Sequence, residues 1–304
     1  DRESALPSSA GRRRVSPAED LRDTTVLITG GNSGIGRATA DALAARGATV
    51  MLAARSDARA RPVVDALRAR YRHASVEYVP IDLASLASVR RAAAAVLATG
   101  RRLDVLINNA GVAGFPGLTA DGFEPTIGTN YIGPFLLTEL LLPRLREAPQ
   151  GRVVNVASAA HARIKQFDWT WLDRRDAPVA RSGFNEYAAS KLMNILHARE
   201  LAPRLDGTRV TTYVLHPGAV ASNIWRALPW PLRTILMLFM ISNEEGAKTP
   251  VWCATAPELA SSSGRYYEKC RESQPTPLAR DDALAGELFR RTEAAIAAAE
   301  ATRS

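Results

Sequence analysis

Short apolar segments alternate with segments of helical periodicity along nearly the whole chain. The apolar segments, which we expect to be strands, lie at residues 24–30, 49–55, 76–82, 103–111, 152–158, 209–218 and 264–269. The helical segments lie at residues 33–47, 60–71, 85–98, 123–146, 185–205, 244–256 and 280–299. Such alternation demands parallel strand pairing through right-handed crossovers, with helices on both faces of the sheet. The sequence therefore predicts an α/β fold.

The predicted strands are almost continuously apolar, which favours a sheet buried on both faces. We expect a doubly wound, Rossmann-type parallel sheet of about seven strands, with its ligand at the carboxyl ends of the strands. No stretch within residues 21–304 has the composition of a linker, so we expect a single domain there. Residues 1–20 are polar and contain no apolar run. They predict a flexible arm, and neither a signal peptide nor a membrane helix.

Charge and cysteine content argue against a nucleic-acid-binding protein and against a metal-binding protein. The formal net charge is +8 and the isoelectric point is near 9.9, but the basic residues are scattered singly along the helices. Only Arg12, Arg13 and Arg14 form a dense run, so we expect no nucleic-acid partner. The two cysteines, Cys253 and Cys270, form no CxxC or Cys/His cluster. We therefore expect no bound metal.

The longest apolar run, residues 228–241, has three interpretations. It is too short to cross a bilayer, which needs about 20 apolar residues. A buried helix, a lid over a substrate pocket and a segment in peripheral contact with a membrane all fit its composition. Together with residues 167–173 it offers side chains for a wide lipophilic pocket, namely Trp169, Trp171, Trp225, Trp230, Leu236 and Phe239. For residues 167–173 we favour ordinary loop packing.

A glycine-rich turn, TGGNSGIG at residues 29–36, joins the first predicted strand to the first predicted helix. Glycines let the backbone turn tightly and approach a pyrophosphate, and the helix start presents free N–H groups and the positive end of its dipole. The spacing differs from the usual G-x-G-x-x-G, so the position between strand and helix carries the prediction. The residues expected to hold a dinucleotide here are Gly30, Asn32, Ser33, Gly34, Ile35 and Gly36.

The end of the second strand favours NADP(H) over NAD(H). NAD-binding proteins usually carry an acidic residue there, about 20 residues past the glycines, to hold the ribose 2′-hydroxyl. This chain has no carboxylate at that point and has Arg55 instead. Arg37 directly follows the glycine motif. Two guanidinium groups near the ribose would attract a 2′-phosphate.

Further polar residues follow the third and fourth strands. Asp82 ends the third strand, where a carboxylate can accept a hydrogen bond from the adenine amino group, and Leu83 follows it. The fourth strand ends in NNAG, so Asn109, Ala110 and Gly111 are expected beside the cofactor.

The sequence YAASK at residues 187–191 places Tyr187 and Lys191 on one face of a predicted helix. Only four of the 39 basic residues are lysines, so a lysine at this position stands out. Ser158 ends the fifth predicted strand, at the mouth of the crevice. A Tyr–Lys pair alone is weak evidence, since a tyrosine on an apolar helix is usually a core residue. The order of glycine loop, Ser158 and then the Tyr–Lys pair is more specific.

These motifs resemble those of the short-chain dehydrogenase/reductase family. The resemblance covers about residues 22–270 and rests on TGGNSGIG, NNAG, TNYIGPF, VASAA, YAASK and HPG, in the family's order. The stretches LAARS, IDLASLASVR, LDVLINNAG, IGPFLLTELLLP and SGRYYEKC are similar to those of the retinol dehydrogenase-like branch.

The resemblance implies four catalytic residues. Tyr187 would be the acid that protonates the substrate's carbonyl oxygen, or the base in the reverse direction. Lys191 would lower the pKa of the phenol, contact the nicotinamide ribose and join a proton relay through water held at Asn130. Ser158 would hydrogen-bond the reacting carbonyl. Tyr187 and Lys191 would also contact the cofactor.

The resemblance also implies a turn beneath the nicotinamide at Pro217 and Gly218, followed by contacts to its carboxamide from Val220 and Ser222. Many members of the family have Thr where Ser222 stands.

We therefore predict an NADP-dependent oxidoreductase that interconverts a carbonyl and an alcohol on a lipophilic, retinoid-like substrate. Two alternatives remain open: another short-chain ketone reductase acting on polyketide-type or xenobiotic ketones, and a non-catalytic NADP-binding regulatory protein. A cytoplasmic location, peripheral membrane contact through residues 228–241 and a homo-oligomer are further expectations.

Overall fold

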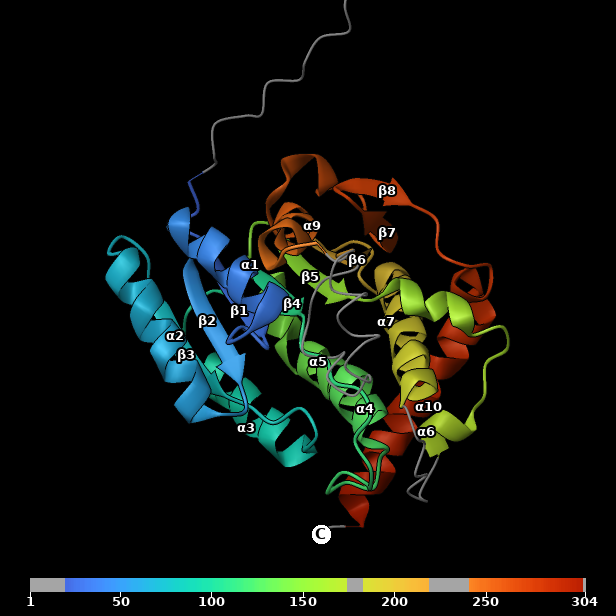
Figure 1. Cartoon of the computed structure of the whole chain (residues 1–304). Coiled ribbons are helices and arrows are strands. Elements are labelled where there is room, and N and C mark those ends of the chain that lie inside the picture. The colour runs from blue at the N-terminus through green and yellow to red at the C-terminus, as the bar shows by residue number, and fades with distance from the viewer. Residues whose placement is uncertain (1–19, 174–182, 219–240, 303–304) are drawn as a thin grey trace, which may run out of the picture.

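The computed structural model describes residues 20–173, 183–218 and 241–302. They form one eight-stranded sheet in the order β3-β2-β1-β4-β5-β6-β7-β8 (Figure 1). Its strands are β1 (Thr25–Thr29), β2 (Thr49–Ala54), β3 (Val76–Pro80), β4 (Val105–Asn108), β5 (Gly151–Val156), β6 (Val210–His216), β7 (Arg265–Glu268) and β8 (Arg271–Ser273). The first seven strands pair in parallel, which confirms the doubly wound fold.

The eighth strand was not predicted, and it runs antiparallel to β7. Lys269 and Cys270 form the two-residue turn between them, with φ of 52° and 55°. Both residues lie in the left-handed region that a tight hairpin requires, a conformation usually supplied by Asn-Gly or Asp-Gly. Because Lys-Cys is not a typical turn sequence, the hairpin could not be predicted from the sequence.

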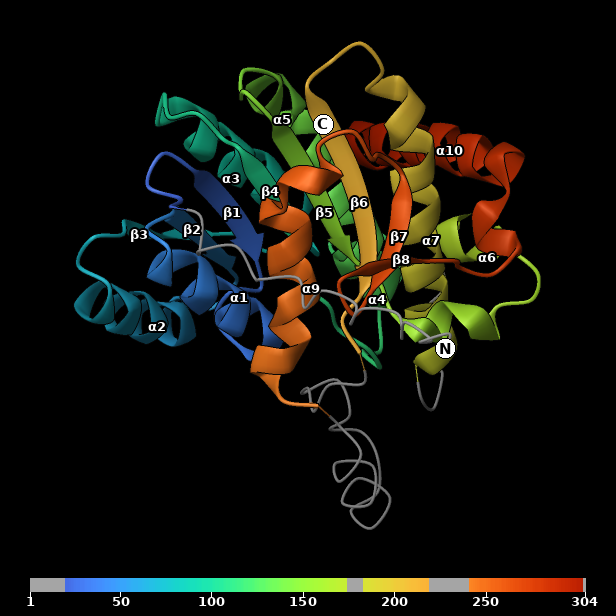
Figure 2. The ribbon, with the colours of Figure 1, turned by 90° about the horizontal axis from the view of Figure 1, so that it is seen from above.

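Helices cover both faces of the sheet (Figure 2). One face carries α1 (Gly34–Ala45), α2 (Asp57–Arg70) and α9 (Asn243–Thr255), and the other carries α3 (Leu86–Ala98), α5 (Gly133–Arg146), α7 (Phe184–Arg204) and α10 (Asp282–Ala301). The short helical elements are α4 (Pro125–Ile127), η1 (Gly128–Ile132), η2 (Ala159–Arg163), α6 (Thr170–Asp173), η4 (Pro257–Leu259) and η5 (Leu278–Arg280). Two separate apolar cores result, one under each helical layer.

The helix predicted over residues 123–146 is continuous but not uniform. A π-helical turn, η1, lies between α4 and α5 and contains Asn130. Single π turns inside helices often occur at functional sites because they redirect one residue. At the start of α5, a Cβ on Gly133 would lie 2.3 Å from the carbonyl oxygen of Leu83. Only glycine therefore allows α5 to pack this closely on the turn after β3.

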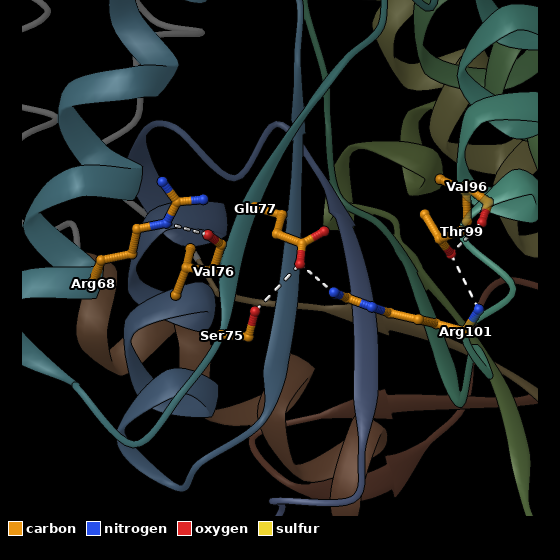
Figure 3. Close-up of polar contacts among 7 residues, drawn as sticks. All are labelled: Arg68, Ser75, Val76, Glu77, Val96, Thr99 and Arg101. Carbon is orange, nitrogen blue, oxygen red and sulfur yellow. Dashed lines mark hydrogen bonds and ion pairs between the residues drawn. The ribbon is translucent and has the colours of Figure 1, made fainter.

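The edge strand β3 is held by polar contacts at its amino end, away from the carboxyl ends where a ligand is expected (Figure 3). Nε of Arg68 donates to the carbonyl oxygen of Val76 at 2.6 Å. The Glu77 carboxylate accepts from Ser75 at 3.3 Å and pairs with Arg101. A charged, capped edge discourages pairing with another chain.

Several expectations concern residues beyond the described ranges. All of the flexible arm predicted for residues 1–20 except Asp20, and all of the apolar run at 228–241 except Ile241, fall outside them. Within the ranges that are described, no helix is both long and apolar enough to cross a membrane.

Candidate active site

Most of the predicted site residues follow the carboxyl ends of neighbouring parallel strands. The glycine turn follows β1, Arg55 follows β2, Asn109 follows β4 and Ser158 follows β5. Parallel strands end on the same edge of the sheet, so the topology brings these segments together. Val220 and Ser222 lie outside the described residues.

The glycine turn needs glycine for two reasons, a left-handed backbone at Gly30 and Gly34 and close packing at Gly36. Gly30 and Gly34 have φ of +68° and +54°, which favour glycine. A Cβ on Gly36 would lie 2.4 Å from both the carbonyl oxygen of Gly30 and Nδ2 of Asn109. The backbone of the turn is therefore bare where it meets the loop after β4. Such a bare cradle fits a dinucleotide pyrophosphate.

The start of α1 supports the same interpretation. Ser33 is the N-cap, but its side chain makes no capping hydrogen bond. The first-turn N–H groups of a helix lack partners within the helix, and here no side-chain cap satisfies them. They can bind a phosphate. Asn32 and Ile35 are half-buried beside them, and Arg37 is exposed on the first turn.

Thr29, which the sequence analysis missed, joins the two loops. Its hydroxyl oxygen accepts from the amides of Asn109 at 3.0 Å and Ala110 at 3.1 Å. Nδ2 of Asn109 in turn donates to the carbonyl oxygen of Thr29 at 2.9 Å. Asn108, the residue before Asn109, is buried, and its side-chain amide donates to Thr138 and Asn155. A buried threonine at the end of a strand gives no distinctive sequence signal.

Asp82 and Leu83 form the turn after β3. Oδ1 of Asp82 accepts from the amide of Ala84 at 3.0 Å, so this carboxylate stabilises its own turn. Leu83 is buried. Asp82 is half-buried, which leaves part of its carboxylate accessible.

Arg55 is exposed directly after β2. Among the described residues its guanidinium makes no ion pair, unlike that of Arg61, which is paired with Asp57. Arg55 also lines an open groove of about 550 Å³ between α2 and β3, and it is the one predicted site residue there. The residues predicted to be catalytic lie elsewhere, after the end of β5 and near the start of α7, so this groove is separate from them.

The side chains of Tyr187 and Ser158 lie close enough for the Ser158 hydroxyl to act on the phenol. Tyr187 is only 7% exposed. Burial raises the pKa of its phenol, and the nearby hydroxyl of Ser158 partly opposes this. Oγ of Ser158 also accepts from the amide of Ala160 at 3.2 Å, capping η2. Ser158 and Tyr187 therefore lie together as the motif order predicted.

The pKa of Tyr187 is raised by burial in this structure, whereas from the sequence we expected Lys191 to lower it. The ammonium of Lys191 donates to the carbonyl oxygen of Val156 at 2.8 Å and lies 5.6 Å from the centre of the Tyr187 ring. The cation is held by the end of β5 and not by the phenol oxygen, so burial dominates the pKa of Tyr187. Burial also lowers the pKa of Lys191 to about 8.

Asn130 is tied to the loop after β4 from the π-helical turn. Its Oδ1 accepts from the amide of Val112 at 2.8 Å, and its Nδ2 donates to the carbonyl oxygen of Val112 at 2.9 Å. Nδ2 also donates to Oγ of Ser190 at 3.0 Å, and Ser190 donates to the carbonyl oxygen of Tyr187 at 2.7 Å. Ser190 thus links Asn130 to the catalytic helix, a role the sequence did not reveal.

Gly111 completes the crevice beside these groups. A Cβ at Gly111 would lie 3.5 Å from Nζ of Lys191 and 3.8 Å from Oδ1 of Asn130. After β6, Gly218 has φ of +98°, so the chain turns after Pro217. The bare backbone at Gly36, the uncapped start of α1 and the buried ammonium near Gly111 fit a nicotinamide dinucleotide along this edge.

No cluster of three or more His, Cys, Asp or Glu side chains able to hold a metal ion occurs in the part of the chain that the structure describes. The aromatic residues of the stretch around Trp169 are partly buried and pack against the core. Phe167 lies edge-on to Trp169 and Trp171, and the Arg291 guanidinium lies 4.3 Å from the Trp169 ring.

Comparison with known proteins agrees with this geometry. Residues 24–168 match the short chain dehydrogenase family. The chain is 45% identical over 276 residues to dehydrogenase/reductase SDR family member 13 of Bos taurus, covering 88% of this chain and 72% of that protein. It is 41% identical over 272 residues to human retinol dehydrogenase 12, covering 88% and 85%.

Among solved structures, an uncharacterized protein from Mycobacterium Paratuberculosis is 33% identical with a TM-score of 0.72, covering 90% of this chain and 92% of that one. The sequence likenesses and the shared fold lead to one conclusion. The chain belongs to the short-chain dehydrogenase/reductase family, in its retinol dehydrogenase-like branch, and is an NAD(P)-dependent oxidoreductase that acts on CH–OH groups.

Proposed function

We propose that the protein is an NADP-dependent oxidoreductase that interconverts a lipophilic aldehyde or ketone and the corresponding alcohol. One observation carries the proposal. The side chains of Ser158 and Tyr187 lie next to each other and beside the buried ammonium of Lys191. This places a proton donor, a second hydroxyl and a cation together at the carboxyl edge of the sheet.

These residues have complementary roles in carbonyl reduction. The bound nicotinamide supplies the hydride that adds to the carbonyl carbon. Tyr187 donates its phenolic proton to the carbonyl oxygen, which becomes the alcohol hydroxyl, and Ser158 donates a hydrogen bond to the same oxygen. Lys191, whose pKa is lowered to about 8, returns a proton to the phenolate through water near Asn130. Alcohol oxidation reverses each step.

Arg55 and Arg37 support NADP(H) as the preferred cofactor. Both guanidinium groups are exposed, and no carboxylate stands at the end of β2 to bind a ribose 2′-hydroxyl. A guanidinium with no ion pair among the described residues, such as that of Arg55, can bind a 2′-phosphate bidentately.

Two exposed apolar side chains support a lipophilic substrate. Phe115 and Leu118 are 51% and 40% exposed. Their loop is tied to the catalytic residues at two points: the Val112–Asn130 hydrogen bonds, and Gly183 at the start of α7. A Cβ on Gly183 would lie 2.4 Å from the backbone of Gly114. Relatives named retinol dehydrogenases make retinoid-like aldehydes the first class to test.

A lipophilic substrate partitions into membranes, so we also propose a cytoplasmic enzyme in peripheral membrane contact through residues 228–241. A polyketide-type or xenobiotic ketone substrate remains a secondary proposal, since any short-chain ketone reductase would use the same four catalytic residues. A homo-oligomer is a further proposal.

The test is turnover of purified protein with NADPH and with NADH on a matched panel: retinal, long-chain aldehydes, short-chain aldehydes and cyclic ketones. We expect the highest kcat/KM with NADPH and the long or retinoid aldehydes. Tyr187→Phe keeps the ring and removes the proton, so turnover should fall at least about 100-fold with NADPH binding retained. Tyr71→Phe, which removes a hydroxyl bonded to Asp41 at 3.1 Å, is the matched control.

Three outcomes would contradict the proposal. Faster turnover of the cyclic ketones favours the ketone reductase alternative. NADPH binding without turnover of any substrate favours a regulatory protein. Full activity in Tyr187→Phe would assign the acid to another group.

A further inference from the structure

Two histidines contact the backbone of the segment that carries Ser158. Nδ1 of His161 lies 2.7 Å from the carbonyl oxygen of Ser158. Nδ1 of His216 lies 3.3 Å from the amide nitrogen of Ala159. His161 is in η2, whereas His216 ends β6, so the segment is held from two different elements. Neither histidine has a role in the reaction described above.

The hydrogen-bond partners define the protonation of both rings. A carbonyl oxygen only accepts, so Nδ1 of His161 carries a proton. The amide of Thr276 donates to Nε2 of His161 at 3.4 Å, so that nitrogen presents a lone pair. The amide of Ala159 likewise donates to Nδ1 of His216, which must be unprotonated. Both imidazoles are therefore neutral in this arrangement.

We propose that His161 and His216 are positioning residues that hold Ser158 against Tyr187 and that they do so only as neutral imidazoles. A second proton on His161 would place an N–H against the amide of Thr276. A second proton on His216 would place an N–H against the amide of Ala159. Either event removes a hydrogen bond and sets two donors facing each other, so the segment must move.

The surroundings of His161 favour its neutral form. Its ring is 4% exposed and lies 5.7 Å from the ring of Tyr266 on β7. Tyr187 faces the same segment through Ser158. Burial lowers the pKa of His161, and the hydrogen bond to Ser158 opposes this in part.

Charged neighbours act on His216 in both directions. Glu268, its partner on β7, favours the imidazolium, whereas His161 and Lys269 oppose it. Burial is the largest influence, and the pKa of His216 is lowered.

The lowered pKa values of His161 and His216 set the pH range in which the neutral arrangement is lost. A histidine whose folded pKa lies below the ordinary value of about 6.5 binds its proton more weakly in the native arrangement than when free. The neutral arrangement is therefore fully favoured above about pH 6.5 and is lost as the pH falls toward the lowered pKa values. We expect turnover to decline on the acid side of neutrality while NADPH affinity changes little.

The kinetic test of this inference rests on the proposed function. The first test needs no substrate, so its result is independent of that function. Ring ¹⁵N NMR of the full chain should show an Nδ1–H tautomer for His161 and an unprotonated Nδ1 for His216 at neutral pH. Both should titrate below the ordinary histidine pKa of about 6.5. The protection of the Ala159 amide, which is its exchange rate relative to the intrinsic rate at the same pH, should fall as His216 protonates. An imidazolium for either ring at neutral pH would overturn the proposal.

The second test is the pH profile of turnover with saturating NADPH. His161→Phe keeps a ring but has no donor for Ser158, so turnover at neutral pH should fall at least about tenfold with unchanged NADPH affinity. His161→Asn keeps a donor near the Nδ1 position and does not titrate, so it should retain turnover within about threefold. The double change His161→Asn with His216→Asn should flatten the acid side of the profile.

His73→Asn is the matched control, because His73 is exposed and its ring forms a hydrogen bond to the carbonyl oxygen of Ala45, at 3.2 Å, far from Ser158 in the chain. Its profile should coincide with that of the parent protein. An unchanged acid side in the double variant, or full neutral turnover in His161→Phe, would overturn the positioning role. If the parent protein turns over no carbonyl at all, the proposed function fails. The NMR result alone then decides whether His161 and His216 hold the segment as neutral imidazoles.

Discussion

The ammonium of Lys191 and the carbonyl oxygen of Val156 are joined by a hydrogen bond of 2.8 Å. Val156 is the last residue of β5. Lys191 lies one helical turn after Tyr187, on the same face of α7. The bond fixes a buried cation between the strand that leads to Ser158 and the helix that carries the phenol. Lysine suits this place because its ammonium is compact and its pKa can fall, whereas a guanidinium is bulky and stays charged.

Lys191→Met should abolish activity and stabilise the protein at neutral pH. A fall of the pKa from 10.5 to about 8 corresponds to a cost of about 3 kcal/mol for the buried charge. Loss of the hydrogen bond to Val156 offsets about 1–2 kcal/mol of the stability gained by removal of that charge. We expect turnover to drop at least about 100-fold and the free energy of unfolding to rise by about 1 kcal/mol, measured by urea denaturation.

The stability difference should depend on pH with a defined sign. Below about pH 8 Lys191 is charged in both states, so its cost is fully present. Between about pH 8 and 10.5 the unfolded chain holds a proton that the native chain has lost, so the stability of the parent protein rises toward that of Lys191→Met. Lys248→Met, at an exposed lysine paired with Glu245, is the control and should change stability by less than about 0.5 kcal/mol. A Lys191→Met variant less stable than the parent would contradict this account of burial.

Arg55→Asp should narrow or invert the cofactor preference. The parent protein should bind NADPH at least tenfold more tightly than NADH, or about 1.4 kcal/mol, in a fluorescence titration. Reversal of the charge after β2 repels a 2′-phosphate and supplies an acceptor for a 2′-hydroxyl. Arg59→Asp makes the same charge change at an exposed position of α2 and should leave the ratio nearly unchanged. Equal affinities of the parent protein for NADPH and NADH would refute the assignment.

Gly36→Ala should damage both folding and cofactor binding. Its methyl group would meet the Gly30 carbonyl oxygen and Nδ2 of Asn109 at 2.4 Å, and the backbone atom cannot rotate away. We expect a loss of about 2–3 kcal/mol in stability and at least tenfold weaker NADPH binding. Gly100→Ala has φ of +65° but no atom within 4 Å of the added carbon, so it should lose only about 1 kcal/mol and bind normally. Normal NADPH binding by Gly36→Ala would show that the turn is looser than described.

Asn130→Ala should lower turnover more than its loss of stability explains. It removes three hydrogen bonds that tie the π-helical turn to Val112 and Ser190. We expect at least tenfold lower turnover and about 3 kcal/mol lower stability. Asn155→Ala removes an equally buried amide from the network inside the sheet, so it should lose similar stability with a smaller effect on turnover. Equal turnover in the two variants would make Asn130 a purely structural residue.

Ser190→Ala separates the two connections of Asn130. It removes the link to the backbone of Tyr187 but leaves both bonds to Val112. Its turnover, measured under the same conditions, should lie between that of the parent protein and that of Asn130→Ala. A loss as large as that of Asn130→Ala would assign the effect to the helix and not to the loop after β4.

Local sequence determined the order of the elements, because apolar runs and glycine turns depend on residues close together in the chain. The strands at 49–55 and 76–82 and the helix at 85–98 were predicted within two residues of their observed bounds. The helix predicted from residue 60 instead begins at Asp57, so Pro62 lies inside it. Proline removes one helical hydrogen bond, and burial of the apolar face of α2 compensates for it. The motif residues likewise identified the glycine turn, Ser158, Tyr187 and Lys191.

Tertiary structure alone decided how those residues act on one another. The pKa of Tyr187 follows from burial and from the nearby hydroxyl of Ser158, and neither is encoded in the spacing of YAASK. The contacts of Thr29, Ser190 and His161 join segments far apart in sequence, and their residue types are common in ordinary cores. A pattern reports periodicity along the chain, whereas a hydrogen bond between two elements depends on how the sheet and helices pack.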